Sequence, residues 1–497
     1  MQITTIQFST DSSAVATIQT DCLIVALNTE QPIAEQLPEL AEATQGFVQR
    51  MADAGELPRT AGKTVTLYHP TGLGADRLLI TGTGKLNKMS DQVYQAIALG
   101  AGKALRDSQA VRAHCLIPRL EVAGRSPSWK IQQAALALDH SDYRYDLTKK
   151  PKDDAPPATA SVSFEDLEGA GAAVGRAGHI ATGVRRCRML GDLPPNICTP
   201  VYVAELAADL ANDIEGLEVD VLDEDQMQAL DMNALLAVGQ GSVNPSRLVH
   251  LRWRGGSADQ KPIAMVGKGV TFDTGGISIK PRELMEQMKF DMCGAASAIG
   301  TIESIARMGL ELNVDCVVAL VENMPDGKSY RPGDVITAMS GKTIEVQNTD
   351  AEGRMILADA LTWTARNVEP DMMVDIATLT GACVVTFGHL ATAVMTQDDE
   401  LAGELLEAGL EAADRAWRLP LWDEYQPLID STFADMRNIG GSGAGSITAG
   451  CFLARFAEGQ RWAHLDIAGS AWRWGKPESA SGRPVGLLSN WLINKVA

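Results

Sequence analysis

The sequence of 497 residues lacks the cysteine pairs from which disulfide frameworks and zinc ribbons are built. Its eight cysteines are dispersed, and none forms a Cys-x-x-Cys spacing with another. Most stand in apolar stretches, such as Asp-Cys-Val-Val-Ala-Leu around Cys316. This usage is typical of buried free thiols in a reducing compartment, so it favours a cytoplasmic protein.

Signatures of several common enzyme classes are also missing. The seven histidines include no His-Glu-x-x-His or other paired zinc spacing, and no Gly-x-Ser-x-Gly surrounds a nucleophilic serine. Gly-Lys-Thr at 341–343 lacks the upstream glycine of a phosphate-binding loop, because Ile336 stands in its place. These absences leave carboxylates and lysines as the candidates for chemistry.

Basic segments and uninterrupted apolar runs are scarce as well. The N-terminus, Met-Gln-Ile-Thr-Thr-Ile-Gln-Phe, lacks the basic start and apolar core of a signal peptide. The most apolar long window runs from Met372 to Met395, and Asp375 and His389 within it favour a buried strand and turn over a membrane span. The formal net charge of −20 repels phosphate backbones and anionic membranes, so neither nucleic acid nor a membrane is an expected partner.

The length and composition indicate a soluble globular protein of two domains. Hydrophobic residues make up 45% and charged residues 21%, and 497 residues exceed what one ordinary core holds. Residues 143–160 are polar, charged and rich in proline, which is typical of a loop or part of a linker. We therefore predict a smaller N-terminal domain over residues 1–165 and a larger C-terminal domain over residues 166–497.

Short apolar runs alternate with helical patterns, which predicts α/β architecture in both domains. In the N-terminal domain we expect strands at Cys22–Leu27, Arg77–Thr81 and Ser161–Phe164, and a helix at Asp91–Leu105 capped by Ser90. A long helix rich in small residues is expected at Glu165–Arg188. Further along we expect strands at Pro262–Val266, Val314–Val321 and Met372–Ile376, and helices at Ala295–Arg307 and Met355–Arg366.

Carboxylates and lysines cluster in three glycine-rich segments of the C-terminal domain. The first holds Lys268, Asp273 and Lys280, the second holds Asp291, and the third holds Asp350, Glu352 and Arg354. Positions 350, 352 and 354 differ by two, so they would share one face of an extended segment. A helix-forming stretch follows at once, which predicts that the triplet lies between a strand and a helix N-terminus, at the functional rim of an α/β sheet.

Four carboxylates at one rim would repel each other strongly unless cations neutralise them. Asp273, Asp291, Asp350 and Glu352 supply four negative charges, and two divalent ions supply four positive ones. This balance favours a two-metal site that polarises a substrate oxygen and activates water. Ligation by oxygen without histidine suits Mn²⁺ or Mg²⁺, while Zn²⁺ stays open.

Residues 185–490 resemble the cytosolic leucine aminopeptidase family of two-metal hexameric exopeptidases. The most specific match is Asn-Thr-Asp-Ala-Glu-Gly-Arg at 348–354, which is similar to the family signature. Val-Gly-Lys-Gly-Val-Thr-Phe-Asp-Thr-Gly-Gly, Lys-Phe-Asp-Met-Cys-Gly-Ala-Ala and Trp-Ala-His-Leu-Asp-Ile-Ala-Gly also match. The resemblance implies a catalytic α/β/α domain around a central mixed sheet, preceded by an N-terminal domain that helps to build the oligomer.

The resemblance also implies roles for individual residues. It assigns one metal to Asp273, Asp350 and Glu352, and the other to Lys268, Asp273, Asp291 and Glu352. Lys280 resembles the lysine that stabilises the oxyanion, and Arg354 resembles the arginine that holds a bicarbonate acting as a proton shuttle. A lysine ligates a metal only when neutral, so Lys268 needs its pKa lowered by burial and nearby cations.

The reaction implied is release of N-terminal residues, preferably Leu or other large apolar ones, from short peptides. A metal-bridging hydroxide would attack the scissile carbonyl, Lys280 would face the developing negative charge, and the free α-amino group of the substrate would bind a metal. Five residues of this sequence resemble, by position, the lining of the side-chain pocket in the family: Met288, Thr378, Gly381, Ala468 and Ala471. These five residues could instead be ordinary core positions.

Two neighbouring features have plainer interpretations. We interpret His464 as a structural histidine rather than a metal ligand. Gly440–Gly445 is expected to be a flexible loop near the mouth of the site, and it could act as a lid.

Other functions stay open at this point. A two-metal phosphoesterase would share the carboxylates but would give no reason for a lysine ligand at 268. Some relatives bind DNA as regulators or serve as structural or chaperone-like hexamers, although suitable residues at all the catalytic positions disfavour an inactive enzyme. The resemblance implies a homohexamer whose active sites face an interior cavity.

Overall fold

The computed structural model describes residues 3–85, 89–150, 154–473 and 479–496. Its contacts divide the chain into two compact units, Ile3–Thr182 and Gly183–Ala497. The division falls inside a long helix, α6 (Ala170–Asp192), whereas the sequence places the domain boundary near residue 165. The proline-rich segment 143–160 is a loop within the N-terminal unit, and its residues 151–153 lie outside the described residues.

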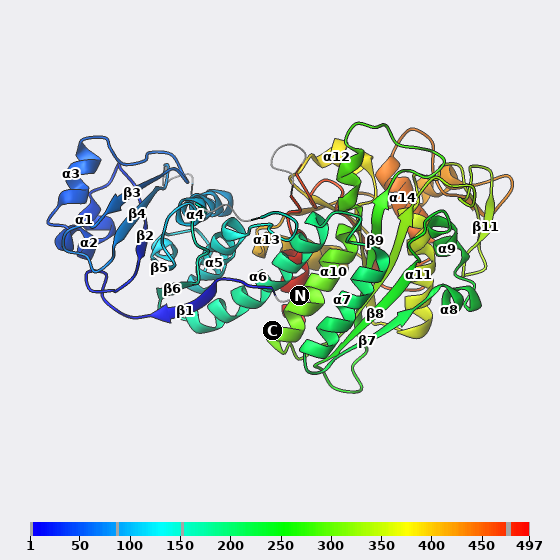
Figure 1. Cartoon of the computed structure of the whole chain (residues 1–497), viewed down its shortest axis with the longest axis horizontal. Coiled ribbons are helices and arrows are strands. Elements are labelled where there is room, and N and C mark those ends of the chain that lie inside the picture. The colour runs from blue at the N-terminus through cyan, green and yellow to red at the C-terminus, as the bar shows by residue number, and fades with distance from the viewer. Residues whose placement is uncertain (1–2, 86–88, 151–153, 474–478, 497) are drawn as a thin grey trace. The chain divides into compact units, whose positions relative to one another are not determined.

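The N-terminal unit is a six-stranded sheet with helices on both faces (Figure 1). All neighbouring strands are parallel except β3 and β4. The strand order is β1 (Gln7–Asp11), β6 (Ser161–Glu165), β5 (Arg112–Cys115), β2 (Cys22–Leu27), β4 (Arg77–Gly82) and β3 (Thr64–Tyr68). The helices are α1 (Ile33–Gln36), α2 (Pro38–Ala43), α3 (Phe47–Asp53), α4 (Asp91–Arg106), the short η2 (Ile117–Arg119) and α5 (Pro127–Asp142).

Strand β2 shows how the sequence builds this unit. Successive side chains of a strand point to opposite faces, and all six residues of β2 are buried. Leu23, Val25 and Leu27 therefore pack with α1–α3, while Cys22 and Ile24 pack with α4 and α5. A strand buried on both faces needs a continuous apolar run, which is what its sequence supplies.

The C-terminal unit is built on an eight-stranded mixed sheet. Its order is β15 (Ala416–Arg418), β14 (Thr392–Met395), β17 (Trp462–Asp466), β13 (Met372–Ala377), β9 (Ile263–Asp273), β10 (Asn313–Asn323), β8 (Arg247–Arg254) and β7 (Leu217–Leu222). The four central strands, β17, β13, β9 and β10, are parallel to one another. Their carboxyl ends therefore meet at one edge of the sheet.

Helices cover both faces of this sheet (Figure 1). One face carries α7 (Pro200–Asp213) and α10 (Cys293–Met308), with α13 (Asp399–Glu411) and α15 (Val485–Ile493) packed alongside. The buried apolar core on the other face includes α9 (Asn233–Gly239), α11 (Gly353–Asn367) and α14 (Gly445–Ala454). The remaining elements are α8 (Glu224–Ala229), η3 (Met285–Met292), α12 (Gly381–Phe387), η4 (Asp423–Ile429) and a small sheet of β11 (Val335–Thr337), β12 (Thr343–Glu345) and β16 (Met436–Arg437).

The two-domain α/β fold is confirmed, with some predicted elements changed. The strand predicted at Pro262–Val266 continues to Asp273, straight through two glycines. A Cβ on Gly267 would lie 2.7 Å from Cα of Ala295, so glycine here lets α10 pack against the strand. The helix predicted at Glu165–Arg188 begins and ends about one turn later, as α6.

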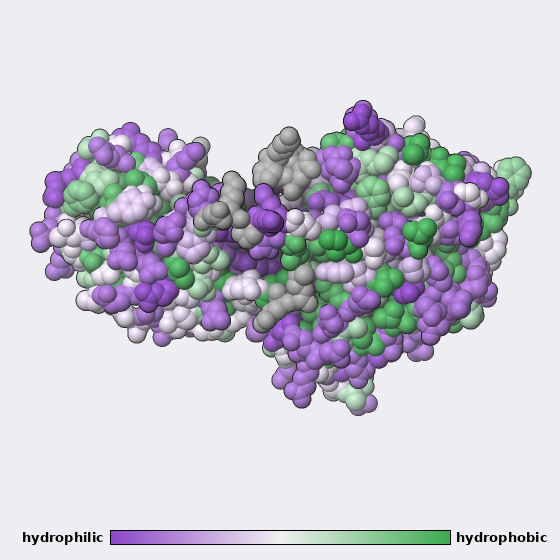
Figure 2. Space-filling view, in the orientation of Figure 1, coloured by the Kyte–Doolittle hydropathy of each residue, from purple (hydrophilic) through white to green (hydrophobic). Residues whose placement is uncertain are grey.

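The surface and thiols agree with the sequence. All eight cysteines are buried and free. On the face drawn in Figure 2, hydrophilic side chains predominate and hydrophobic ones are scattered among them in small groups. None of the helices in the described residues is both long and apolar enough to span a membrane.

Candidate active site

The candidate site lies where the central parallel strands end. Asp273 is the last residue of β9 and pairs in register with Asn323, the last residue of β10. Ala377, at the end of β13, pairs with Asp466, at the end of β17. Because these strands are parallel, four chain segments reach the same edge, which is where α/β sheets place their ligands.

Three carboxylates meet at this edge. Asp273, Asp350 and Glu352 each direct one oxygen to a common point, and these three oxygens lie within 4.8 Å of one another. Asp273 and Glu352 are buried and Asp350 is half-buried. The arrangement could hold a cation by oxygen ligation alone.

The expectation that residues 350, 352 and 354 share one face of an extended segment is wrong. Glu352 is the N-cap of α11 and has a helical backbone, with φ −79° and ψ −35°. Arg354 lies in the first turn of that helix and donates from Nη1 to the carbonyl of Asn438 at 2.8 Å. The helix starts earlier than a strand-like spacing assumes, so the arginine and the two acids point to different partners.

Two lysines lie between the carboxylates. Nζ of Lys280 lies 2.8 Å from Asp273 and 2.5 Å from Asp350. Nζ of Lys268 lies 2.8 Å from both Asp291 and Glu352. The structure therefore brings all six predicted carboxylates and lysines into one connected cluster.

The acids of this cluster hold protons more tightly than free acids do. Burial, followed by the charge of Glu352, raises the pKa of Asp273 to about 7. Burial likewise raises the pKa of Asp291 well above its usual range and raises that of Asp350. Glu352 is the exception, because Lys268 and Lys280 outweigh its burial and lower its pKa.

This pattern shows a site short of positive charge. Four carboxylates face two ammonium groups, so two negative charges would be uncompensated if all four acids were ionised. The raised pKa values of the three aspartates reflect this shortage of positive charge. Oδ2 of Asp291 is also buried without a hydrogen-bond partner in the described part of the chain. A free carboxylate oxygen and surplus negative charge are what divalent cations would satisfy, so these residues fit metal binding.

The pKa of Lys268 is raised, whereas a metal-binding lysine is expected to have a lowered one. Burial acts in the expected direction, but Asp291, Glu352 and Asp273 outweigh it and raise the pKa of Lys268. Lys280 behaves alike, because Asp273, Glu352 and Asp350 outweigh its burial and raise its pKa. Lys280 therefore stays protonated, whereas Lys268 could become a neutral ligand only if cations first neutralised its acidic partners.

Several supporting residues were not predicted from the sequence. Nδ2 of Asn323 donates to Oδ1 of Asp273 at 2.8 Å and to the carbonyl of Thr349 at 3.0 Å. The hydroxyl of Tyr330 also donates to the Thr349 carbonyl. These contacts leave Oδ2 of Asp273 facing the cluster and hold the segment that carries Asp350. The one signal in the sequence was that Asn323 follows a predicted buried strand.

Arg354 is buried, and its burial lowers the pKa of its guanidinium to about 10. Its Nε has no hydrogen-bond partner among the described residues. The loop predicted at Gly440–Gly445 begins two residues after Asn438, whose carbonyl accepts from Arg354, and leads into α14. An arginine with an unused donor is suited to an oxyanion.

The predicted pocket residues lie on segments around the cluster. Met288 is three residues before Asp291 on η3, and Thr378 donates from its hydroxyl to Oδ1 of Asp291 at 2.8 Å. Gly381 begins α12, and a Cβ built there would meet nothing within 4 Å. Ala468 and Ala471 are buried just after β17.

His464 contacts a carboxylate outside the cluster. Its Nδ1 lies 2.6 Å from Asp375 on the neighbouring strand, and both side chains are fully buried. Burial opposes a charge on His464, but Asp375 outweighs it and raises the pKa of the histidine. The contact agrees with a structural histidine.

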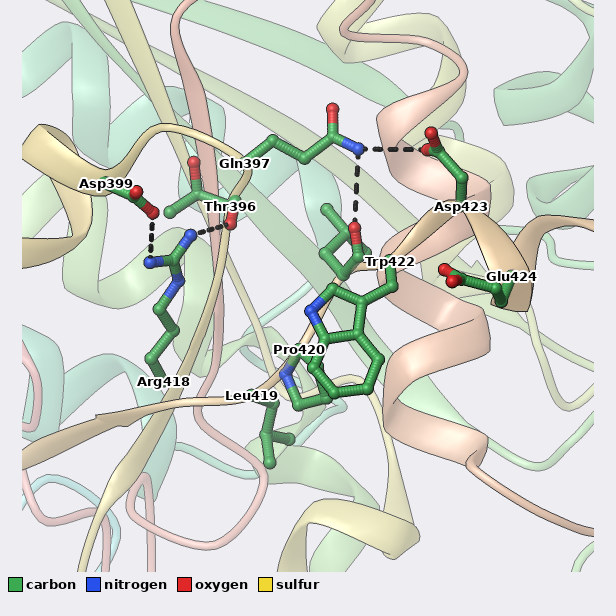
Figure 3. A pocket seen from close by; sticks show the side chains of 10 residues that line it. Thr396, Gln397, Asp399, Arg418, Leu419, Pro420, Trp422, Asp423 and Glu424 are labelled. Carbon is green, nitrogen blue, oxygen red and sulfur yellow. Dashed lines mark hydrogen bonds and ion pairs between the residues drawn. The ribbon is translucent and has the colours of Figure 1, made fainter.

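A separate hollow of about 970 Å³ lies on the C-terminal unit, between residues 396–399 and 418–424 (Figure 3). Arg418 in its wall is paired with Asp399, and Gln397 with Asp423. None of the predicted site residues lines this hollow. The hollow is therefore distinct from the cluster of predicted site residues.

Comparison with known proteins decides the family. The catalytic domain of the cytosol aminopeptidase family matches residues 185–489, and the N-terminal domain of the same family matches residues 24–152. The chain belongs to the cytosol aminopeptidase family. A probable cytosol aminopeptidase of Xylella fastidiosa is 48% identical over 492 residues, 99% of each chain. One of Stenotrophomonas maltophilia is 49% identical over 479 residues, 96% of each chain.

Solved structures of similar fold support the assignment. A tomato leucine aminopeptidase mutant matches with a TM-score of 0.87 and 30% identity, over 99% of this chain and 97% of that one. A bottromycin maturation enzyme in complex with Mn matches with a TM-score of 0.83 and 30% identity, over 96% of this chain and 100% of that one. The chain is thus a metallo-aminopeptidase of this family, which hydrolyses the N-terminal residues of peptides.

Proposed function

We propose that this aminopeptidase uses two divalent metal ions, Mn²⁺ or Zn²⁺, and prefers N-terminal Leu and other large apolar residues of short peptides. The observation that carries the proposal is the buried, connected cluster of four carboxylates and two lysines with surplus negative charge. One ion would be held by Asp273, Asp350 and Glu352. The other would be held by Lys268, Asp273, Asp291 and Glu352.

When bound, two such ions supply a Lewis acid for the scissile carbonyl and water activated near neutral pH. Lys280 contributes a fixed positive charge, because Asp273 and Asp350 keep it protonated and aimed across the cluster. A preorganised ammonium at this place stabilises negative charge as it develops on the carbonyl oxygen. Removing a donor of this kind typically costs about 10²–10³ in kcat.

Arg354 would hold bicarbonate as a proton shuttle. Its buried Nε is an unused donor, and its Nη1 is anchored on Asn438, so the guanidinium is oriented before any anion arrives. The lowered pKa of about 10 still leaves it charged at neutral pH. A bidentate contact from a fixed guanidinium suits a planar carboxylate-like anion.

The substrate side chain would lie against Met288, Thr378, Gly381, Ala468 and Ala471. The open space beside Gly381 and the small alanines support room for a large apolar side chain. The whole enzyme would act as a cytoplasmic homohexamer. Full-length similarity to aminopeptidases with "cytosol" in their names and eight buried free thiols support the compartment.

The test is chelator treatment followed by assay with leucine p-nitroanilide. We expect cleavage to stop after metal removal and to return with Mn²⁺ or Zn²⁺, while N-acetylated leucine p-nitroanilide stays uncut. Alanine and glutamate p-nitroanilides should react more slowly than the leucine compound. Cleavage that survives complete metal removal, or equal cleavage of the acetylated compound, would overturn the proposal.

A further inference from the structure

The segment between β13 and α12, residues 378–380, is hydrogen-bonded to the carboxylate of Asp466. Oδ1 of Asp466 accepts the backbone N–H of Leu379 at 3.2 Å and that of Ala468 at 3.1 Å. Oδ2 accepts the hydroxyl of Thr380 at 2.6 Å. Asp466 is fully buried, and each oxygen of its carboxylate already has a donor. It is therefore placed to hold the backbone rather than to ligate a metal.

The same segment contacts two residues of the carboxylate and lysine cluster, Lys268 and Asp291. The carbonyl of Thr378 accepts from Nζ of Lys268 at 2.8 Å, and the hydroxyl of Thr378 donates to Oδ1 of Asp291 at 2.8 Å. An ammonium group has three N–H donors, and those of Lys268 face Asp291, Glu352 and the Thr378 carbonyl. Moving the Thr378 carbonyl would therefore turn Lys268 and shift Asp291 with it.

We propose that Asp466 is a positioning residue for metal binding, acting through Thr378 on Lys268 and Asp291. The inference rests on the proposed metal site. Through the N–H groups of Leu379 and Ala468, the same carboxylate also ties together two segments of the proposed side-chain pocket. Residues that orient metal ligands through hydrogen bonds commonly change metal affinity about 10–100-fold when they are replaced.

Two variants probe this chain of contacts. Asp466→Asn keeps one oxygen for the backbone N–H groups but loses the acceptor for the Thr380 hydroxyl. Thr380→Val removes that hydroxyl, together with its contacts to Ser446 and to the N–H of Cys383, while leaving Asp466 and its backbone contacts in place. The matched control is Asp359→Asn, because Asp359 is also fully buried and accepts two backbone N–H groups, from Leu235 at 2.9 Å and Met339 at 2.8 Å, without touching the cluster.

The measurement is a titration of chelator-stripped protein with Mn²⁺, in which electron paramagnetic resonance reports the concentration of the free ion. We expect Asp466→Asn to bind Mn²⁺ about 10–100-fold more weakly, Thr380→Val to shift in the same direction by less, and Asp359→Asn to bind like the wild type. Excess Mn²⁺ should restore the kcat of Asp466→Asn towards the wild-type value. If the substitution instead damaged the fold, kcat would stay low at high Mn²⁺.

The outcomes separate the two proposals. If Asp466→Asn does not fold, Thr380→Val carries the test. Wild-type Mn²⁺ affinity in the folded variants would overturn the role of Asp466 while leaving the metal site intact. Wild-type protein that binds no Mn²⁺ or Zn²⁺ would overturn the proposed metal site, and the inference with it.

Discussion

Replacing Gly353 with alanine tests how closely the first turn of α11 packs on the cluster of carboxylates and lysines. Gly353 follows Glu352 and begins the helix, where alanine is normally the better residue. A Cβ at this position would lie 2.5 Å from Cε, 2.6 Å from Cδ and 2.7 Å from Nζ of Lys268. Real Cβ atoms do not approach other atoms this closely, so Lys268 would have to move.

The magnitude follows from two opposing effects. Exchanging glycine for alanine within a helix gains at most about 1 kcal/mol. Overpacking a buried side chain costs about 1–3 kcal/mol, and breaking a buried ion pair costs about 3–5 kcal/mol. Lys268 is 2% exposed and has three polar partners, so it cannot yield without losing at least one of them. Subtracting the helix gain from the cost of the lost ion pair, we predict a net loss of about 2–4 kcal/mol in stability and weaker Mn²⁺ binding.

Thermal unfolding and Mn²⁺ titration measure the two effects. The matched control is Gly403→Ala, in the middle of α13, where a Cβ would meet nothing within 4 Å. We expect Gly403→Ala to melt at the wild-type temperature or higher and to bind Mn²⁺ normally, while Gly353→Ala melts lower and binds Mn²⁺ more weakly. A Gly353→Ala protein that is as stable as the control and binds Mn²⁺ equally well would refute the packing argument.

Three further predictions follow from other residues. Lys280→Met should lower kcat about 10²–10³-fold without weakening Mn²⁺ binding, and equal kcat values would contradict its role at the oxyanion. Asn323→Ala should weaken Mn²⁺ binding about tenfold by freeing Asp273, as titration of the stripped protein would show. Asp359 has its pKa raised by burial from 3.8 to about 7, so the stability that it contributes is complete below pH 3.8 and is lost as the pH rises through 7. The melting temperature of Asp359→Asn should therefore fall less between pH 5 and pH 8 than that of the wild type, and an equal fall would count against this titration.

The sequence predicts elements well where a local rule governs them. The sequence predicts that Ser90 caps a helix, and its side chain does accept from the N–H of Val93 at the start of α4. The strand at Cys22–Leu27 has the predicted bounds, because a doubly buried strand requires a run of apolar residues. The chemistry and the family motifs of six acids and lysines predict one site, and these six side chains do converge.

Long-range packing limited the rest of the prediction. The glycines of β9 suggest the end of a strand, but Gly267 lies inside the strand and leaves room for α10, whose residues are distant in the sequence. The spacing of residues 350, 352 and 354 fits a strand as well as a turn entering a helix, and only the fold decides between them. The sequence does not single out Asp466, although it lies two residues after His464. Its hydrogen-bond donors, Leu379 and Thr380, are distant in the sequence, so they leave no local pattern.

The carboxylates and lysines at the sheet edge are proposed to form a two-metal centre. Its most direct test is a crystal of the wild-type protein grown with Mn²⁺, measured for anomalous scattering. We expect two peaks about 3.5–4 Å apart, one beside Asp273, Asp350 and Glu352 and the other beside Lys268 and Asp291. Metal-loaded crystals of active enzyme with no peak at these residues, or with peaks only elsewhere, would contradict it.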